Sequence, residues 1–345
     1  EKGNEYLKSK QNPEGYWAQP SYPALTALAV TAYMRDPANQ GKPLPEYIRK
    51  GYDFILKSQK EDGSIFNRGM SSYNTAVCMM ALLAANKEEY APAILKGRAY
   101  LIKQQNHFAP DNPYNGGIGY GDKQAPPIAD LSNTSLALEA IYYSQKLAKD
   151  GKYGEQPDLD WNAATEFINR CQQNPAVNKE PWVSNDKSQL GGFVYRPGVS
   201  SARDKKAAAF DKAEPPKAYG SMTYAGMQSL IYANVDKNDP RVKLALKWLE
   251  NSYSLDENPG MGVQGLYYYY QAMSKALSAM GIDTLTLENG RKVDWRDELA
   301  NKLISIQKSD GSWVNTNNRW WEADPVLVTS YCVLALEQLY HSIPR

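Results

Sequence analysis

Cysteine and histidine are scarce in this sequence of 345 residues. The three cysteines, Cys78, Cys171 and Cys332, are too few for a disulfide framework. With only His107 and His341, the chain cannot supply a three-histidine metal site, and a Ser–His–Asp triad is not expected. Neither histidine has companions at a spacing typical of metal ligands. We therefore expect neither a metal nor a cofactor.

Excess charge and long apolar runs are also missing. Lys and Arg number 39 against 38 Asp and Glu, so no basic field favours nucleic acid or an anionic membrane as a partner. No run approaches the roughly 18 uninterrupted apolar residues of a membrane-spanning helix. The 42% hydrophobic content is enough for a large core. The chain starts at Glu1 rather than Met, which favours an exported location, periplasmic or extracellular, and leaves a trimmed cytoplasmic form as the alternative.

What the sequence does contain is an internal repeat. Each copy reads as an amphipathic helical run that ends in Gln, then a polar break with Gly, then an aromatic or apolar residue. The copies lie at 6–17, 50–64, 96–105, 164–173, 246–253 and 303–313, and the fifth has lost its Gln. Six copies in 345 residues give a period of about 57, within the range of helical repeats once insertions are allowed.

A second helical pattern, apolar almost all round, follows each copy. These segments are 24–30, 74–83, 134–143, 223–232, 266–277 and 329–339. A helix without a polar face is buried on both sides, whereas the Gln-ending helices carry charges on one side and should face water. Six such alternations predict an all-α fold, an α6/α6 toroid that forms a single domain over residues 1–345. A straight solenoid is the competing arrangement, and length alone would also allow two domains.

In a closed ring, all six turns from an outer to an inner helix lie on one rim. Three of these connections are long, near 106–130, 174–220 and 309–328, and long loops in compact repeat proteins are usually functional or disordered. They surround the N-termini of inner helices, whose free N–H groups and dipoles favour anionic or electron-rich groups. We therefore expect a small-molecule ligand at the mouth of the ring on this rim.

The copies at 50–64 and 303–313 best keep the pattern Lys-Gly-x-x-x-aromatic/aliphatic-Leu followed by Gln-x-x-x-Gly-Ser-Trp. This pattern resembles the repeat of the squalene cyclase and protein prenyltransferase β-subunit superfamily. The resemblance covers essentially the whole chain. It implies an α/α toroid, in agreement with the periodicity, and a central cavity that in the family's enzymes holds polyisoprenoids.

The acid of the family's bacterial cyclases has no counterpart here. Those enzymes protonate a double bond with the middle Asp of an Asp-x-Asp-Asp-Thr-Ala motif that opens an inner helix. Four inner helices keep the Thr of the motif, and at the acid position they carry Tyr73, Ser132, Ser221 and Leu327. None of these side chains can protonate an alkene, and only Asp130 survives, at the first position of the motif.

The zinc ligands of the prenyltransferase branch are missing as well. That branch binds zinc through an Asp-x-Cys pair opening one inner helix and a His opening a later one. The corresponding stretches, 218–221 and 328–332, read Ala-Tyr-Gly-Ser and Val-Thr-Ser-Tyr-Cys. A zinc site of that type cannot form from these residues.

Two carboxylates, Glu322 and Asp324, stand directly before the last inner helix. With Asp130 they are the candidate acid and base, because an aromatic wall beside a carboxylate raises its pKa by desolvation. The neighbouring candidate ligand contacts are Arg319, Trp320 and Trp321. Alternatively, Arg319 pairs with Glu322 on the surface, and Asp324 is a helix N-cap.

Four successive tyrosines, Tyr267, Tyr268, Tyr269 and Tyr270, open the fifth inner helix. Because residues i and i+2 do not share a helix face, at least one of them should point into the cavity. Such rings stack on sugars, stabilise cations or pack in the core.

The last candidate region is basic. Residues 196–217 carry six basic and three acidic side chains, a charge suited to a phosphate, sulfate or uronate, or simply to a solvated loop. The remaining candidate ligand contacts are Tyr195, Arg196 and Tyr224.

Three kinds of function remain open at this level. The first is an enzyme that uses the rim carboxylates on an isoprenoid, or on a glycan, since unrelated α/α toroids host sugar lyases and hydrolases. The second is a non-catalytic protein that binds an isoprenoid or a glycan. The third is a scaffold whose outer face binds another protein. The sequence does not specify the oligomeric state.

Overall fold

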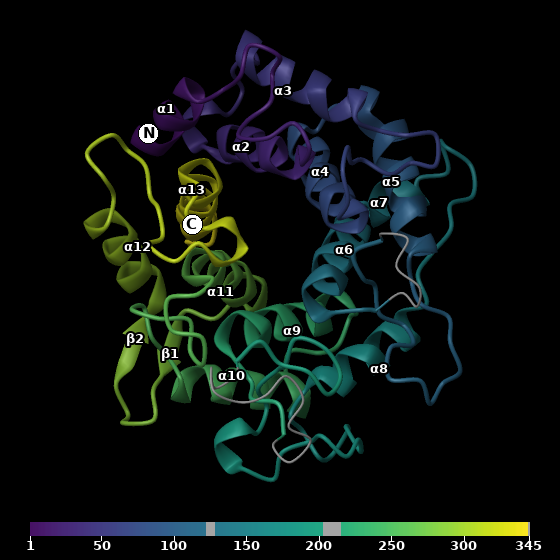
Figure 1. Cartoon of the computed structure of the whole chain (residues 1–345), viewed down its shortest axis with the longest axis vertical. Coiled ribbons are helices and arrows are strands. Elements are labelled where there is room, and N and C mark those ends of the chain that lie inside the picture. The colour runs from purple at the N-terminus through teal and green to yellow at the C-terminus, as the bar shows by residue number, and fades with distance from the viewer. Residues whose placement is uncertain (122–127, 203–214, 344–345) are drawn as a thin grey trace.

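The computed structural model describes residues 1–121, 128–202 and 215–343, which form two concentric rings of helices (Figure 1). The inner ring consists of α2 (Pro23–Arg35), α4 (Ser71–Ala85), α6 (Leu131–Tyr143), α9 (Gly220–Tyr232), α11 (Leu266–Met280) and α13 (Pro325–His341). The outer ring consists of α1 (Lys2–Ser9), α3 (Glu46–Lys57), α5 (Ala91–Lys103), α8 (Trp161–Cys171), α10 (Pro240–Asn251) and α12 (Trp295–Ser305). The predicted alternation of outer and inner helices is thus confirmed.

Smaller elements fill the connections. A short helix, α7 (Gln145–Lys149), follows α6, and the antiparallel strands β1 (Thr284–Thr286) and β2 (Lys292–Asp294) precede α12, with Leu285 opposite Val293. Four 3-10 turns lie at Pro37–Asn39, Glu88–Tyr90, Lys187–Gln189 and Arg319–Trp321. In the part of the chain that the structure describes, no helix has the length and apolar character needed to cross a membrane.

The inner ring is closed. Each inner helix contacts the next in chain order, and α13 contacts α2, so the last repeat packs against the first. The predicted α6/α6 toroid is therefore confirmed, and the straight solenoid is wrong. The inner helices are buried because their neighbours flank them on both sides and the outer helices cover them from outside (Figure 1).

The repeated Gln joins neighbouring outer helices. Gln59 Nε2 donates to the carbonyl of Gly63 in its own turn (3.2 Å) and to that of Ala93 at the start of the next outer helix (2.9 Å). The same pair of bonds recurs for Gln11, Gln105 and Gln172, and Gln307 keeps the bond to its own turn. One side-chain amide thereby satisfies two carbonyls that would otherwise lack a protein partner at a helix boundary.

A repeated Thr ties each turn to the inner helix that follows it. The backbone N–H of Ile65, just after the turn, donates to Thr75 Oγ1 (2.9 Å). Equivalent bonds join Trp17 to Thr26, Ile118 to Thr134, Phe193 to Thr223 and Trp313 to Thr329. Thr75, Thr134, Thr223 and Thr329, which the sequence shares with the cyclase motif, therefore have a structural role, and Thr26 has the same role in the first repeat.

The repeat that lost its Gln uses Asn258 instead. This buried amide accepts from the backbone N–H of Ser221 (2.9 Å) and donates to the carbonyl of Gln264 (3.1 Å). It connects the start of α9 to the loop before α11. The N-termini of these inner helices are consequently held side by side.

Candidate central cavity

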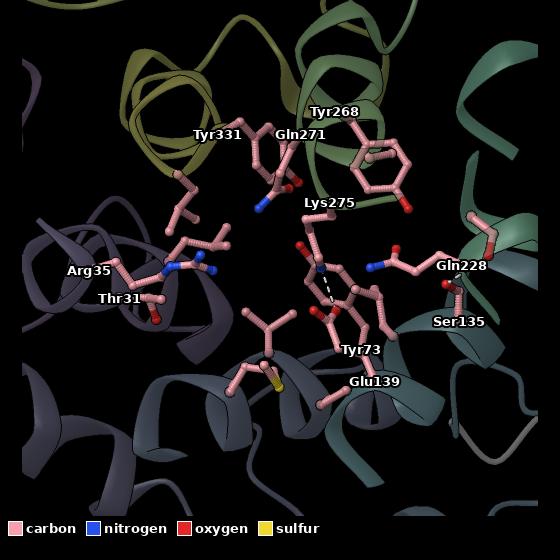
Figure 2. A pocket seen from close by; sticks show the side chains of 18 residues that line it. Thr31, Arg35, Tyr73, Ser135, Glu139, Gln228, Tyr268, Gln271, Lys275 and Tyr331 are labelled. Atoms are coloured by element: carbon pink, nitrogen blue, oxygen red, sulfur yellow. Dashed lines mark hydrogen bonds and ion pairs between the residues drawn. The ribbon is translucent and has the colours of Figure 1, made fainter. Parts of the chain in front are cut away.

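The six inner helices enclose one cavity on the axis of the ring (Figure 2). Its volume is about 80 Å³. The apolar lining consists of Leu28, Ala76, Val77, Met80, Leu136, Ala225, Ala272 and Leu334. The polar and aromatic lining consists of Thr31, Arg35, Tyr73, Ser135, Glu139, Gln228, Tyr268, Gln271, Lys275 and Tyr331. Every inner helix contributes at least two lining residues, as expected for a cavity at the centre of a closed ring.

Three tyrosines lie toward the N-terminal ends of the inner helices. Tyr73 and Tyr268 are each the third residue of their helix, and the ring centroid of Tyr268 is 6.0 Å from that of Tyr331. The hydroxyl of Tyr268 is 3.5 Å from Ser132 Oγ. Burial raises the pKa of all three phenols, so they are neutral hydrogen-bonding groups at physiological pH.

The charged lining residues lie further along the helices. Lys275 Nζ forms an ion pair with Glu139 across the cavity (Figure 2). Arg35 Nη2 donates to the side-chain oxygen of Gln338 (2.5 Å). Within the described residues, no carboxylate lies at ion-pair distance from Arg35. This end of the cavity is therefore polar and carries one more positive than negative charge.

The candidate acid Glu322 caps a helix. It is 1% exposed, its Oε1 accepts from the backbone N–H of Tyr268 (2.8 Å), and its Oε2 accepts from Asn315 Nδ2 (2.7 Å). Burial raises the pKa of Glu322, and the hydrogen bonds from the start of α11 oppose that rise. The surface pairing of Arg319 with Glu322 is wrong, because Glu322 is buried and Arg319 donates to Gln264 and lies over the ring of Trp320.

The two candidate aspartates are N-caps as well. Asp324 accepts from the backbone N–H groups of Val326 (2.8 Å) and Leu327 (3.4 Å), so its interpretation as a helix cap is confirmed. Asp130 caps α6 and accepts from both the backbone and the side-chain amide of Asn133 (2.8 Å each). Neither aspartate, nor Glu322, lines the cavity.

The cap at Glu322 gives a stability prediction. Glu322→Ala is expected to lower the free energy of unfolding by about 2 kcal/mol, because it removes the acceptor of a buried backbone N–H and one of the two acceptors of the Asn315 amide. Glu322→Gln keeps one carbonyl oxygen for the N–H of Tyr268 and should lose less than half as much. Urea denaturation followed by circular dichroism measures both, and equal losses would argue against the capping role.

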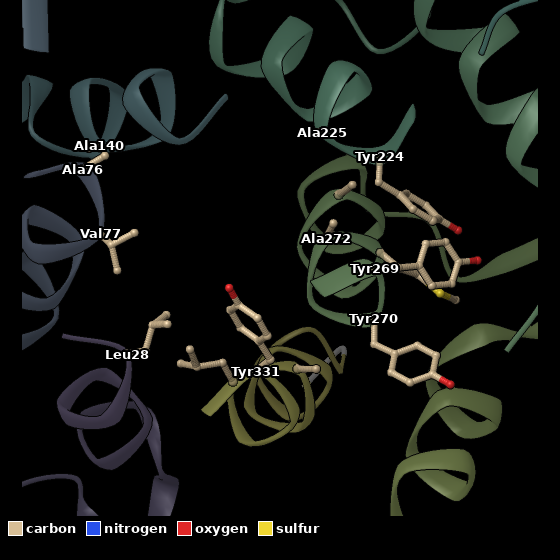
Figure 3. Packing of buried hydrophobic residues seen from close by; sticks show 14 of the residues in the cluster. Leu28, Ala76, Val77, Ala140, Tyr224, Ala225, Tyr269, Tyr270, Ala272 and Tyr331 are labelled. Atoms are coloured by element: carbon tan, nitrogen blue, oxygen red, sulfur yellow. The ribbon is translucent and has the colours of Figure 1, made fainter. Parts of the chain in front are cut away.

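Only one of the four successive tyrosines lines the cavity, and it is Tyr268. The hydroxyls of Tyr267, Tyr269 and Tyr270 donate outward, to the carbonyls of Val314, Ser254 and Leu255. Tyr224 is also turned away from the axis and is fully buried against Tyr269 (Figure 3). As candidate ligand contacts, Tyr224, Tyr267, Tyr269 and Tyr270 are thus placed behind the cavity wall.

Trp320 and Trp321 lie on the rim. They are 47% and 41% exposed, and both have positive φ, 55° and 64°. The ring of Trp321 contacts Tyr22 just before α2, with centroids 4.7 Å apart, so this loop bridges the last and the first inner helices. Neither tryptophan lines the cavity itself.

The basic insertion is described only in part. The backbone N–H of Arg196 donates to Val199 in a tight turn, and Tyr195 OH donates to Tyr120 OH (3.4 Å). Residues 203–214, which carry four of the six basic side chains, lie outside the described residues, as do 122–127 of the loop at 106–130.

Sequence analysis missed the charged cavity residues Arg35, Glu139 and Lys275. A signal was present, since Glu139 and Lys275 each interrupt a segment that is otherwise without charge, and Arg35 ends one. A charge in a helix buried on both sides requires a partner or a wet cavity. Among the residues that the structure describes, no group of three or more His, Cys, Asp or Glu side chains is placed to hold a metal ion.

No protein-family model and no curated protein matches this sequence. Solved structures do match over the whole ring. The type II terpene cyclase MstE from Scytonema, in complex with geranylgeranyl dihydroxybenzoate, is 10% identical with a TM-score of 0.57, and the match covers 99% of this chain and 96% of that one. Protein geranylgeranyltransferase-I from Candida albicans, complexed with GGPP, is 14% identical with a TM-score of 0.62, over 99% and 90%.

A protein from Actinoplanes of unspecified activity matches over 98% of both chains, with 13% identity and a TM-score of 0.51. Such low identities show the fold and nothing finer. The closed double ring, the Gln–Gly–Thr turns and these full-length matches agree with one another. This chain has the α/α toroid fold of terpene cyclases and protein prenyltransferases.

Proposed function

We propose that this protein binds a small, largely apolar molecule of the isoprenoid class in its central cavity, and that it acts by binding rather than through acid catalysis from the rim. The observation that carries the proposal is the cavity to which all six inner helices contribute. Eight of its eighteen lining residues are aliphatic or Met, and three more are tyrosines. Such a surface favours an apolar ligand with a few polar groups.

The fold supports the choice of ligand class. The Scytonema cyclase was solved with geranylgeranyl dihydroxybenzoate, and the Candida transferase with GGPP. Both ligands carry a geranylgeranyl chain. Because this chain has the same fold and a cavity with a partly aliphatic lining, we expect it to bind the same kind of molecule.

The capping roles of the rim carboxylates favour binding over catalysis. Asp130, Glu322 and Asp324 each accept hydrogen bonds from the start of an inner helix. A general acid must reach the proton acceptor directly or through one water. These three groups face helix N-termini. At the acid position of the cyclase motif, the four inner helices that keep the Thr carry Tyr73, Ser132, Ser221 and Leu327, which cannot protonate an alkene.

The size of the cavity bears on how a ligand enters. A volume of about 80 Å³ holds several water molecules, whereas a benzene-sized ligand occupies a cavity of about 150 Å³. Six lining side chains are long and unbranched: Arg35, Met80, Glu139, Gln228, Gln271 and Lys275. Because these side chains change rotamer without moving the backbone, we expect binding to enlarge the cavity by side-chain rotation.

The proposal is tested by measuring ligand binding before and after a larger side chain is placed in the cavity. Geraniol, farnesol and geranylgeraniol serve as probes in calorimetry and native mass spectrometry of the purified protein. Ala225→Leu places a larger side chain in the cavity wall and is expected to weaken binding by at least about tenfold, since one added methylene is already felt in a close-fitting pocket.

Ala300→Leu, the same substitution on the outer helix α12, is the matched control and should leave binding unchanged. Circular dichroism and thermal unfolding establish that both variants are folded. Absence of binding by every probe would refute the proposal, as would full binding by a folded Ala225→Leu protein.

A further inference from the structure

The cavity has one polar end, and two cations face it. Arg35 is the last residue of α2, and Lys275 lies in the third turn of α11. Both side chains point toward the middle of the cavity from different sides of the ring (Figure 2). The amides of Gln228 and Gln271 and the hydroxyls of Thr31 and Ser135 line the same cavity.

The charges at this end do not cancel. Glu139 is the one carboxylate among the lining residues, and it is paired with Lys275. Arg35 has the neutral amide of Gln338 as its side-chain partner, and its carbonyl contacts His341 Nε2 (2.8 Å). Two cations against one anion leave a net charge of +1 on the cavity wall.

The other carboxyl groups near Arg35 do not add a second negative charge to the cavity lining. Asp36 accepts from Asn4 (2.8 Å) and caps the turn at Pro37–Asn39, outside the lining. Glu337 is 6% exposed and is not a lining residue. Burial raises the pKa of Glu337 well above its usual value, and the nearby Arg35 opposes that rise.

A partly buried guanidinium that makes no ion pair with any described residue favours an anionic partner. The planar fork of Arg matches the two oxygens of a carboxylate and can bind them bidentately. From this arrangement we infer that the cavity binds an isoprenoid or similar aliphatic carboxylic acid, with the carboxylate between Arg35 and Lys275 and the chain against the aliphatic and tyrosine wall. This inference rests on the proposed function, whose ligand class it narrows.

The net charge also distinguishes among anions. A carboxylate brings one negative charge and neutralises the wall, whereas a diphosphate brings two or more and would leave an excess negative charge in a confined, poorly solvated space. The structure thus favours the monoanion. The apolar residues Leu28, Val77 and Leu334 are then left for the chain.

Three probes with one chain test the inference: farnesoic acid, farnesol and farnesyl diphosphate, titrated into the full protein at pH 7.5. The wild type should bind the acid at least about tenfold more tightly than the alcohol, as a charge-assisted hydrogen bond requires, and more tightly than the diphosphate. Arg35→Gln should lower the affinity for farnesoic acid much more than that for farnesol, so that the preference for the acid is lost. Arg49→Gln, on the exposed face of α3, is the matched control, and this variant should keep the preference for farnesoic acid over farnesol.

The outcomes separate the two proposals. If none of the three probes binds, the isoprenoid-binding function itself fails. If the acid and the alcohol bind equally, or the diphosphate binds most tightly, the carboxylate inference is overturned while isoprenoid binding stands. The comparison of probes on the wild type decides the matter even if Arg35→Gln does not fold.

Discussion

Replacing Gly63 by Ala is expected to lower the free energy of unfolding by about 4 kcal/mol, one of the largest effects of any single substitution in this protein. Gly63 has a φ of +90°, a conformation that L side chains rarely adopt. A Cβ added there would lie 2.2 Å from the carbonyl oxygen and 2.6 Å from the carbonyl carbon of Lys96 in α5. Both atoms belong to the backbone of a helix and cannot rotate away.

Two costs combine in this estimate. The left-handed conformation costs a non-glycine residue about 1–2 kcal/mol. Forcing α5 away from the turn costs a further amount of about 1–3 kcal/mol, as overpacking generally does. The displacement also disturbs the bond from Gln59 to Ala93, because that bond fixes the start of the same helix.

Gly151→Ala is the matched control. Gly151 also has a positive φ, +78°, but an added Cβ would meet no atom within 4 Å. It should therefore cost only the conformational part, about 1 kcal/mol. Guanidinium denaturation of both variants gives the comparison. Losses of similar size would show that the close approach of turn and helix contributes nothing.

The same contact closes the ring. A Cβ at Gly311, in the turn before α13, would lie 2.4 Å from the carbonyl oxygen of Lys2 in α1. The sixth turn thus packs on the first outer helix as Gly63 packs on α5. The final repeat therefore meets the first through the same close approach of a turn glycine that joins α1 to α3, α3 to α5, α5 to α8 and α8 to α10.

This explains why the toroid was predictable from the sequence. In the repeats that keep them, the Gln, the Gly and the Thr act within one turn and on the adjacent helix. Their spacing along the chain is therefore enough to indicate the contacts that they make. The inner helices were recognisable for an equally local reason. They lack a polar face because they have no solvent-exposed side.

The candidate site was less predictable, and the carboxylates show why. Asp130, Glu322 and Asp324 stand at or just before helix N-termini. An acidic residue at that place stabilises the helix through its free N–H groups, and the cyclase acid of the related superfamily occupies a similar place. Sequence position alone cannot separate the two roles, whereas the hydrogen bonds do.

The tyrosines illustrate a second limit. Tyr267 to Tyr270 are identical in chemistry, so no hydrophobic pattern indicates which of them faces the axis. The rotation of α11 about its own axis decides that, and it is set by contacts with α9, α13 and the loop that contains Leu255. Arg35, Glu139 and Lys275 converge for the same reason, although they are far apart in sequence.

The second large effect is expected at Asp130 and depends on pH. Desolvation by burial raises the pKa of this carboxyl to about 6, against hydrogen bonds from Asn133 that lower it. Because the pKa is higher in the folded than in the unfolded chain, protonation favours the folded state. The stability that the proton provides is present below about pH 4 and is lost as the pH rises toward 6.

Asp130→Asn removes this dependence and keeps the cap, since Asn is as good an N-cap residue as Asp. The variant should match the wild type near pH 4 and exceed its free energy of unfolding by about 3 kcal/mol at pH 7, the equivalent of two pKa units. The surroundings can accept the new amide. Asn133 Oδ1 is buried without a hydrogen-bond partner, and a flip of the Asn133 side chain lets this oxygen accept from the NH₂ group that the substitution introduces.

Urea denaturation of wild type and variant at half-unit steps from pH 4 to pH 7 measures the difference. The buried carboxyls of Glu322 and Glu337 also titrate, but they are common to both proteins and cancel in the subtraction. Asp160→Asn, at the exposed N-cap of α8, is the control and measures what the same exchange does at an exposed cap. A pH-independent difference for Asp130→Asn would mean that this carboxyl is charged in the folded protein. Its cap would then be an ordinary ionised one, because the burial that distinguishes Asp130 from Asp160 would have no energetic consequence.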